Sequence, residues 1–380
     1  MRLLMPIAGL ILPAALIAQS SATIPQGFDA KEGDRSHWSI SQYGPSRTQI
    51  IYNAALVKGA PKVITKISFR KDGAYKSATI MAPKHDTFHT LYAATKGVPD
   101  ADHNSWLLSE NHGSNFTMHM ARTRISWPQM TNSGNNQPEA FNVVFPLSKP
   151  IILTGGNLLL QIDSETPSGN YRNSNRWQID AQNYPATSGT GGRISFPAGK
   201  IGCNGTNGRY ASHYASPASY SARPGAKMRL YMWRISFKAK AAISYLGTPL
   251  ASSIPLDALG MTGCKLHINP IVAIPLALGY PSGKTATSYN RAFGHVTIPN
   301  DANLAGVTLA MQALIADPGA NAANLVMSNM STVKLGSALP KTGLRQAMMI
   351  YYYSSVFGKE VLKWDHMGFY ATYAPIIKVN

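Results

Sequence analysis

The sequence predicts an all-β protein. Charged residues make up only 14% of the 380 residues, while 32 glycines and 25 prolines interrupt the chain, which is typical of many short strands joined by turns. Several segments also alternate apolar and polar side chains with a period of two, as in residues 63–70. The chain is longer than one ordinary hydrophobic core requires, so we expect two domains.

The N-terminus has the pattern of a secretory signal. Arg2 is followed by an apolar run over residues 3–17 and then by small residues up to Ala22. We therefore assign residues 1–22 to a signal peptide, with cleavage after either Ser20 or Ala22. The apolar run is too short to favour a membrane span, so we expect a secreted extracellular or cell-surface protein with no membrane span.

Alternating segments continue along the first half of the chain. They predict strands near residues 48–52, 63–70, 74–81, 115–120, 141–145, 158–163 and 176–180. A glycine-rich stretch over residues 187–199 is the best candidate for a domain boundary.

The second half contains a break in an otherwise regular pattern. Met228, Leu230 and Met232 share one parity, and Trp233 and Ile235 take the other, which predicts a β-bulge near Met232 or Trp233 with Trp233 in the core. Further strands are expected at residues 242–246, 264–268 and 295–298. Residues 304–316 fit either a strand or one face of a helix.

An uncharged segment follows near the C-terminus, over residues 347–357. Such a segment needs a sheet partner or burial, because an exposed strand edge of this kind promotes self-association. We therefore treat the C-terminal segment, residues 346–380, as a candidate docking element whose candidate assembly residues are Ile350, Tyr351, Tyr352, Tyr353 and Phe357.

Cys203 and Cys264 are the only two cysteines, and a glycine precedes each of them. In an oxidising compartment two thiols in one domain tend to pair, which favours a disulfide over two separate buried thiols. A zinc site is less favoured because the close C-x-x-C spacing is absent.

Positive charge is concentrated in the second half. Residues 201–380 contain 16 Lys and Arg against 5 Asp and Glu, whereas residues 23–200 contain 18 against 12. This imbalance favours a polyanionic neighbour such as an acidic polysaccharide or an envelope surface, and the alternative is a solvated surface without a specific partner. No motif indicates a specific nucleic-acid partner.

The order of several short motifs resembles a class of uncharacterised bacterial secreted proteins. The matching segments are residues 67–72, 156–162, 202–208, 246–247, 254–257, 263–266, 298–301, 304–306, 311–313, 317–321 and 325–329. The resemblance implies two β-sandwich (jelly-roll-like) domains, over residues 23–198 and 199–336, and a strand at residues 304–316. It also implies a disulfide between the two Gly-Cys motifs. Residues 337–380 lie beyond it and form a C-terminal extension, and the class brings no known activity.

Catalytic and metal motifs are weak. There is no G-x-S-x-G or H-E-x-x-H pattern, so no catalytic residue is assigned, and no cofactor or metal is expected. Asp163 and Glu165 share one strand face and are the best carboxylate pair for a hydrolase. His85 and His89 are the alternative metal ligands, although on a strand they lie too far apart to chelate one ion.

Aromatic and basic side chains supply candidate ligand-binding residues, which are Trp106, Trp177, Arg209, Tyr210 and Arg223. Three hypotheses remain. The first is a non-enzymatic surface or matrix protein whose expected partners include other copies of itself, bound through its C-terminal segment. The second is a protein that binds acidic polysaccharide, and the third is a secreted hydrolase with an unrecognised site.

Overall fold

The computed structural model shows an all-β protein. It describes residues 21–37, 40, 46–73, 84–101, 108–129, 137–165, 177–184, 193–215, 222–278, 289–337, 346–353, 369–371 and 373–380. One α-helix of four residues, α1 (Ala54–Val57), and three short 3₁₀ turns, Leu108–Asn111, Asp257–Leu259 and Ala302–Leu304, accompany the strands of these residues. No helix within the described ranges is long and apolar enough to cross a membrane.

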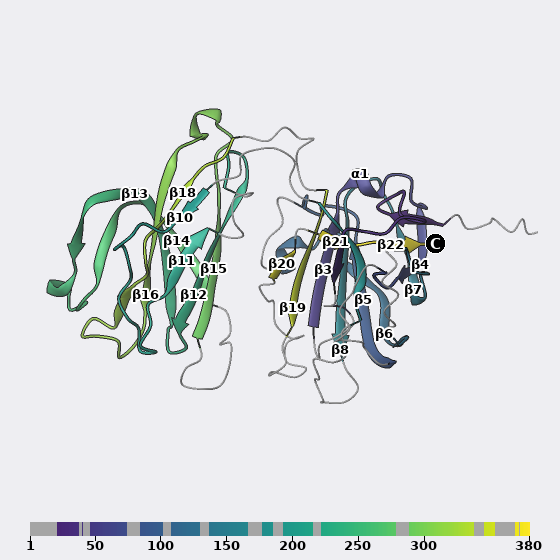
Figure 1. Cartoon of the computed structure of the whole chain (residues 1–380), viewed down its shortest axis with the longest axis horizontal. Coiled ribbons are helices and arrows are strands. Elements are labelled where there is room, and N and C mark those ends of the chain that lie inside the picture. Colours follow the sequence, from purple (N-terminus) through teal and green to yellow (C-terminus); the bar gives the residue numbers. More distant parts are fainter. Residues whose placement is uncertain are drawn as a thin grey trace, which may run out of the picture.

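The strands gather in two lobes (Figure 1). The strands of the N-terminal lobe form three sheets. The first has the order β1-β22-β4-β7, with β1 (Ala22–Ile24), β22 (Ile377–Val379), β4 (Val63–Phe69) and β7 (Val143–Ile152). The second has the order β20-β19-β3-β8-β5-β6, with β20 (Phe369–Ala371), β19 (Ala347–Tyr353), β3 (Ser46–Tyr52), β8 (Leu158–Glu165), β5 (His85–Ala94) and β6 (Thr117–Trp127). The third joins β2 (Arg35–His37), β9 (Ile179–Asn183) and β21 (Tyr373–Pro375).

The C-terminal lobe is built on one sheet of nine strands. Its order is β10-β18-β16-β13-β14-β15-β12-β11, and β17 pairs with β16. The strands are β10 (Arg193–Ser195), β18 (Ser331–Lys334), β16 (Thr308–Ala316), β13 (Ala241–Pro255), β14 (Lys265–Leu278), β15 (Tyr289–Thr297), β12 (Lys227–Ser236), β11 (Ser212–Ala215) and β17 (Leu325–Met327). β16 confirms the strand that the resemblance implied. β10 already belongs to this sheet, so the C-terminal sheet begins before residue 199, where the second domain was predicted to start.

Each lobe has its own hydrophobic core. In the N-terminal lobe Trp127 and Trp177 pack at a centroid distance of 5.1 Å, and Phe69 and Phe145 lie edge to face at 5.1 Å. The core of the C-terminal lobe is rich in methionine and alanine and includes the disulfide. Because aromatic side chains bury the most area, they stabilise the first core strongly, while the disulfide supplements the second.

The C-terminal segment returns to the N-terminal lobe. β19 is hydrogen-bonded along both edges, to β3 on one side and β20 on the other, and β22 lies between β1 and β4. Ile350 is fully buried, and Tyr351, Tyr352 and Tyr353 pair through their backbone with residues 46–48. The backbone of β19 is thus paired within the chain, along its whole length with β3 and over Met349–Tyr351 with β20, and docking of this segment onto another molecule stays a prediction. Phe357 lies outside the described residues.

Candidate functional site

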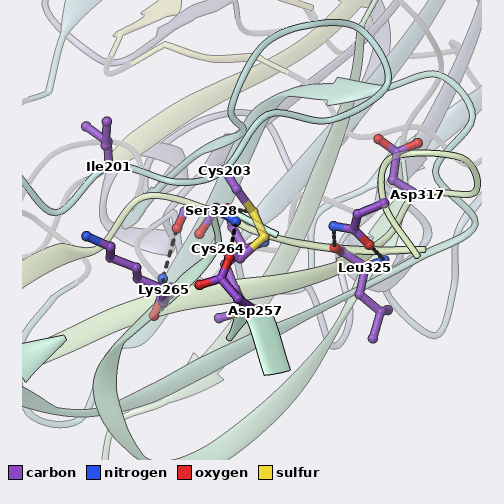
Figure 2. The surroundings of a disulfide bond; sticks show 12 residues. Ile201, Cys203, Asp257, Cys264, Lys265, Asp317, Leu325 and Ser328 are labelled. Carbon is purple, nitrogen blue, oxygen red and sulfur yellow. Dashed lines mark hydrogen bonds between the residues drawn. A yellow bond between two sulfur atoms is a disulfide. The ribbon is translucent and has the colours of Figure 1, made fainter. Parts of the chain in front are cut away.

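The disulfide is the anchor of the candidate site. Cys203 and Cys264 are bonded at 1.98 Å, which confirms the predicted pairing. Cys203 also pairs with β17, because its N–H donates to the carbonyl oxygen of Met327 at 3.1 Å. Figure 2 shows the disulfide beside Ser328 and Asp257, with Asp317 on a separate loop. The bond therefore joins the loop after residue 201 to the turn before β14, and the hydrogen bond to Met327 attaches this loop to β17 as well.

The glycine before each cysteine has a physical reason. A Cβ on Gly202 would lie 2.5 Å from the carbonyl oxygen of Met327, so only glycine allows the backbones to approach this closely. Gly263 has a φ of 75°, in the left-handed region that glycine adopts without strain.

The loop after Cys203 is held by a buried carboxylate. Asp317 is 1% exposed and accepts hydrogen bonds from the backbone N–H of Thr206 at 2.8 Å and from its hydroxyl at 2.9 Å. The loop ends in Arg209, which is exposed, and Tyr210, which is half-buried. The negative charge of Asp317 thus lies beneath the loop, and the cation of Arg209 lies on its surface.

This loop contacts the bulge of β12. The pairing of β12 with β15 shifts between Met232 and Ile235, which confirms the predicted bulge. The side-chain amide of Asn207 donates to the carbonyl oxygen of Arg234 at 3.2 Å, which links the loop to the bulge. The prediction that Trp233 is a core residue is wrong. The bulge places both Trp233 and Arg234 between the buried Met232 and Ile235, and Trp233 is only half-buried.

Arg234 has an unusual backbone conformation. Its φ is 61°, in the left-handed region that costs a residue with a side chain on the order of 1–2 kcal/mol. Its guanidinium carbon lies 4.4 Å from the centroid of the Trp233 ring, within the range of a cation–π contact. Bulges often redirect a side chain beside a functional site, and backbone strain of this kind concentrates there.

We call Arg209, Tyr210, Trp233, Arg234 and Lys238 the bulge surface. Lys238 is exposed and lies two residues after the end of β12, and its backbone N–H donates to the hydroxyl of Ser236 at 3.1 Å. Ser212, two residues after Tyr210, is paired directly opposite Trp233. The loop with Arg209 and Tyr210 is thus linked to the bulge with Trp233 and Arg234 through the Asn207 contact and the pairing of Ser212 with Trp233.

The other predicted ligand-binding residues lie elsewhere. Trp177 is 1% exposed and belongs to the N-terminal core, and Arg223 is 3% exposed. Both predictions are therefore wrong for a surface site, because each side chain is enclosed. Trp106 lies outside the described residues.

The predicted hydrolase and metal residues also have structural explanations. Asp163 and Glu165 share one face of β8, as expected, but Asp163 is paired with Arg47 at 2.7 Å and Glu165 with Arg122 at 3.1 Å. His89 contacts the hydroxyls of Thr87 and Ser164 through its two ring nitrogens, and burial lowers its pKa to about 3. A histidine whose two nitrogens are both occupied has none left for a metal ion.

A cluster of carboxylates in the N-terminal lobe was not anticipated. Glu32, Asp72 and Asp180 offer oxygens that all lie within 4.8 Å of one another. Arg70 is fully buried and donates to Asp180 at 2.7 Å. Burial, reinforced by Asp180, raises the pKa of Glu32 to about 8, and burial raises the pKa of Asp180 to about 6 against the effect of Arg70. A proton on Glu32 thus relieves the repulsion between the carboxylates.

The cluster explains how the lead-in segment is attached. Glu32 accepts from the backbone N–H of Gly73 at 2.7 Å, and the N–H of Gly33 donates to Asp180 at 3.0 Å. The contacts join residues that are far apart in the sequence, so no local pattern predicts them. We interpret the cluster as a structural link between the segment before β2 and the ends of β4 and β9.

Comparison with protein-family models, with curated proteins and with solved structures finds no match for this chain.

Proposed function

We propose that this is a non-enzymatic extracellular protein that binds an acidic polysaccharide through the bulge surface. The observation that carries the proposal is the Arg234 side chain stacked on Trp233 beside the loop that presents Arg209. An aromatic ring offers a flat apolar area to the C–H face of a sugar, and a guanidinium binds a carboxylate or sulfate with two parallel hydrogen bonds. The two groups together match a sugar ring that bears an anionic substituent.

The charge distribution supports the same ligand class. Arg209, Arg234 and Lys238 contribute three positive charges to the surface, while Asp317 is buried under the loop. The whole second half has an excess of eleven basic residues, from 16 Lys and Arg against 5 Asp and Glu over residues 201–380. Such a field raises the local concentration of a polyanion and speeds its association, more so at low ionic strength.

Rigidity supports the proposal as well. The disulfide and the Asp317 contacts fix the loop, and the Asn207 contact fixes the bulge. Binding therefore orders few additional groups, which lowers its entropic cost.

The hydrolase and assembly hypotheses have less support. Each carboxylate of the predicted pair is engaged by an arginine, and the strand predicted to dock onto a neighbour lies within the sheet of its own lobe. We therefore favour binding without catalysis.

The test uses polygalacturonate, a polymer of carboxylated sugars, in affinity electrophoresis under native conditions. Arg209→Ala and Arg234→Gly remove one guanidinium each, and glycine at position 234 accepts the φ of 61° without strain. Each variant is expected to bind about ten-fold more weakly than the unmodified chain, the loss that about 1.4 kcal/mol of a charge-assisted contact produces.

The control is Lys149→Ala, which removes an exposed positive charge from the N-terminal lobe. It should bind like the unmodified chain. The proposal is refuted if the unmodified chain does not bind, or if both bulge-surface variants bind as tightly as Lys149→Ala does.

A further inference from the structure

A serine and a histidine are hydrogen-bonded to each other near the disulfide, outside the bulge surface. The hydroxyl of Ser253 on β13 lies 2.7 Å from Nδ1 of His267 on β14. His267 is fully buried, whereas Ser253 is half-buried and lies between two exposed residues, Ser252 and Ile254. Ser253 is therefore the member of the pair that solvent reaches.

An irregularity in β13 places Ser253 beside the histidine. The pairing of β13 with β14 shifts between Pro249 and Ile254. Residues 250–253 of β13 therefore lie opposite a single residue of β14, which is His267. Bulges of this kind redirect a side chain and are frequent beside active sites.

The second ring nitrogen of His267 fixes the direction of the hydrogen bond. Nε2 lies 3.1 Å from the carbonyl oxygen of Ile201, which only accepts, so Nε2 carries the proton of the neutral ring. Nδ1 is then the acceptor, and the hydroxyl of Ser253 donates to it. Burial lowers the pKa of His267, and the charges of Lys200 and Lys265 lower it further, so the ring is neutral near pH 7.

A cation contacts the same hydroxyl group. Nζ of Lys200 donates to Oγ of Ser253 at 2.9 Å. Lys200 is half-buried, and its carbonyl oxygen accepts from the N–H of Met330 at 2.9 Å, which holds its backbone in place. A positive charge at this distance stabilises the negative charge that develops on the serine oxygen as its proton leaves.

The disulfide connects the segments that carry these groups. Ile201 lies two residues before Cys203 (Figure 2). His267 lies three residues after Cys264, so the bond links the carbonyl group that orients the ring to the strand that carries the ring. The backbone N–H of His267 also donates to Oε1 of the buried Gln312 at 2.9 Å. The ring is thus held in one orientation before any ligand arrives.

We propose that Ser253 is a nucleophile that takes an apolar acyl group from an activated ester. A hydroxyl bonded to a histidine that a third group orients is the arrangement that activates a serine. Oγ attacks the carbonyl carbon of the ester, and its proton passes to Nδ1 of His267. The bond to the leaving alcohol then breaks, that alcohol takes the proton from His267, and the acyl group stays on Oγ as a new ester.

Exposed apolar side chains near the pair indicate the kind of acyl group. Ile254, adjacent to Ser253, is 49% exposed, and Ile201, whose carbonyl contacts His267, is 63% exposed. A hydrocarbon chain that covers part of this area gains free energy from its burial. The reaction modifies each chain once, so it suits a protein that works by binding, and it does not depend on the bulge surface.

The test treats the full chain with p-nitrophenyl butyrate and, separately, with an alkyl fluorophosphonate, which forms a stable adduct with an activated serine. The unmodified chain should release nitrophenolate faster than Ser253→Ala does. Peptide mass spectrometry should find the phosphonate on Ser253. His267→Gln should slow both reactions about a hundred-fold, as loss of a positioned base does. Lys200→Met, which keeps the length of the side chain without its charge, should slow them about ten-fold.

The matched control is Ser252→Ala, which removes the exposed hydroxyl next to the site. It should react like the unmodified chain. The inference is overturned if the phosphonate does not attach to Ser253, or if Ser253→Ala or His267→Gln, shown to be folded by circular dichroism, reacts as fast as Ser252→Ala. Ser253→Ala should still bind polygalacturonate, and Arg209→Ala should still react at Ser253, so failure of one proposal is distinguishable from failure of the other.

Discussion

The return of the C-terminal segment to the N-terminal lobe makes a specific prediction for Ile377→Ala. Ile377 is fully buried in β22, which lies between β1 and β4 and pairs with Phe69. Truncating a fully buried isoleucine removes its transfer free energy and leaves a cavity, so the free energy of unfolding should fall by about 3–4 kcal/mol. That is a large part of the total stability of an ordinary domain.

The neighbouring Lys378→Ala is the matched control. Its ammonium is 3.8 Å from Asp29, and the two side chains are 33% and 58% exposed, so the pair contributes little. Urea unfolding followed by the fluorescence of the buried Trp127 and Trp177 measures both variants. Equal midpoints for Ile377→Ala and Lys378→Ala would refute the placement of β22 inside the sheet.

Three further predictions follow from the structure. Glu32→Gln should gain stability relative to the unmodified chain as the pH rises from about 5 to 9. The pKa of Glu32 is raised from 4.5 to about 8 in the folded state, so the folded chain binds this proton more tightly than the unfolded chain and loses that stabilisation as Glu32 ionises. Urea midpoints measured across pH test this, and parallel pH profiles for the two chains would contradict it. Cys264→Ser should lower the free energy of unfolding of the C-terminal lobe by about 4 kcal/mol, since the disulfide closes a loop of 61 residues. Calorimetry with and without reductant measures this loss, and an unchanged melting temperature would contradict the prediction. In an exporting host the mature chain should begin at Ser21, because cleavage after Ala22 would remove the residue that pairs with Val379 in β1; N-terminal sequencing distinguishes the two sites.

Local patterns predicted the features that depend on neighbouring residues. The alternation of apolar and polar residues predicted an all-β protein, and the break in that alternation after Met232 located the bulge. Both signals are local, because successive side chains of a strand point to opposite faces of the sheet whatever the distant parts of the chain do. The glycines beside the two cysteines were visible in the sequence, and the structure adds that Gly202 permits a close backbone approach.

Features that depend on distant partners were not predictable in the same way. The apolar character of residues 347–353 showed that the segment needs a partner, but it could not show that the partner is β3, which precedes it by about 300 residues in the chain. Trp233 was misplaced because the bulge sets two residues, Trp233 and Arg234, opposite one residue of β15, and the sequence does not show which face each of them takes. The Glu32, Asp72 and Asp180 cluster joins three separate segments.

The central claim is that the bulge surface binds an acidic polysaccharide through charge and aromatic contact together. The most direct test compares polygalacturonate with its fully methyl-esterified form, which has the same sugar backbone without the carboxylates, over a series of sodium chloride concentrations. We expect the purified protein to bind the acidic form, to bind it progressively more weakly as salt increases, and to bind the ester far less. Equal affinity for the two polymers, or an affinity for the acidic form that does not change with salt, would contradict the account.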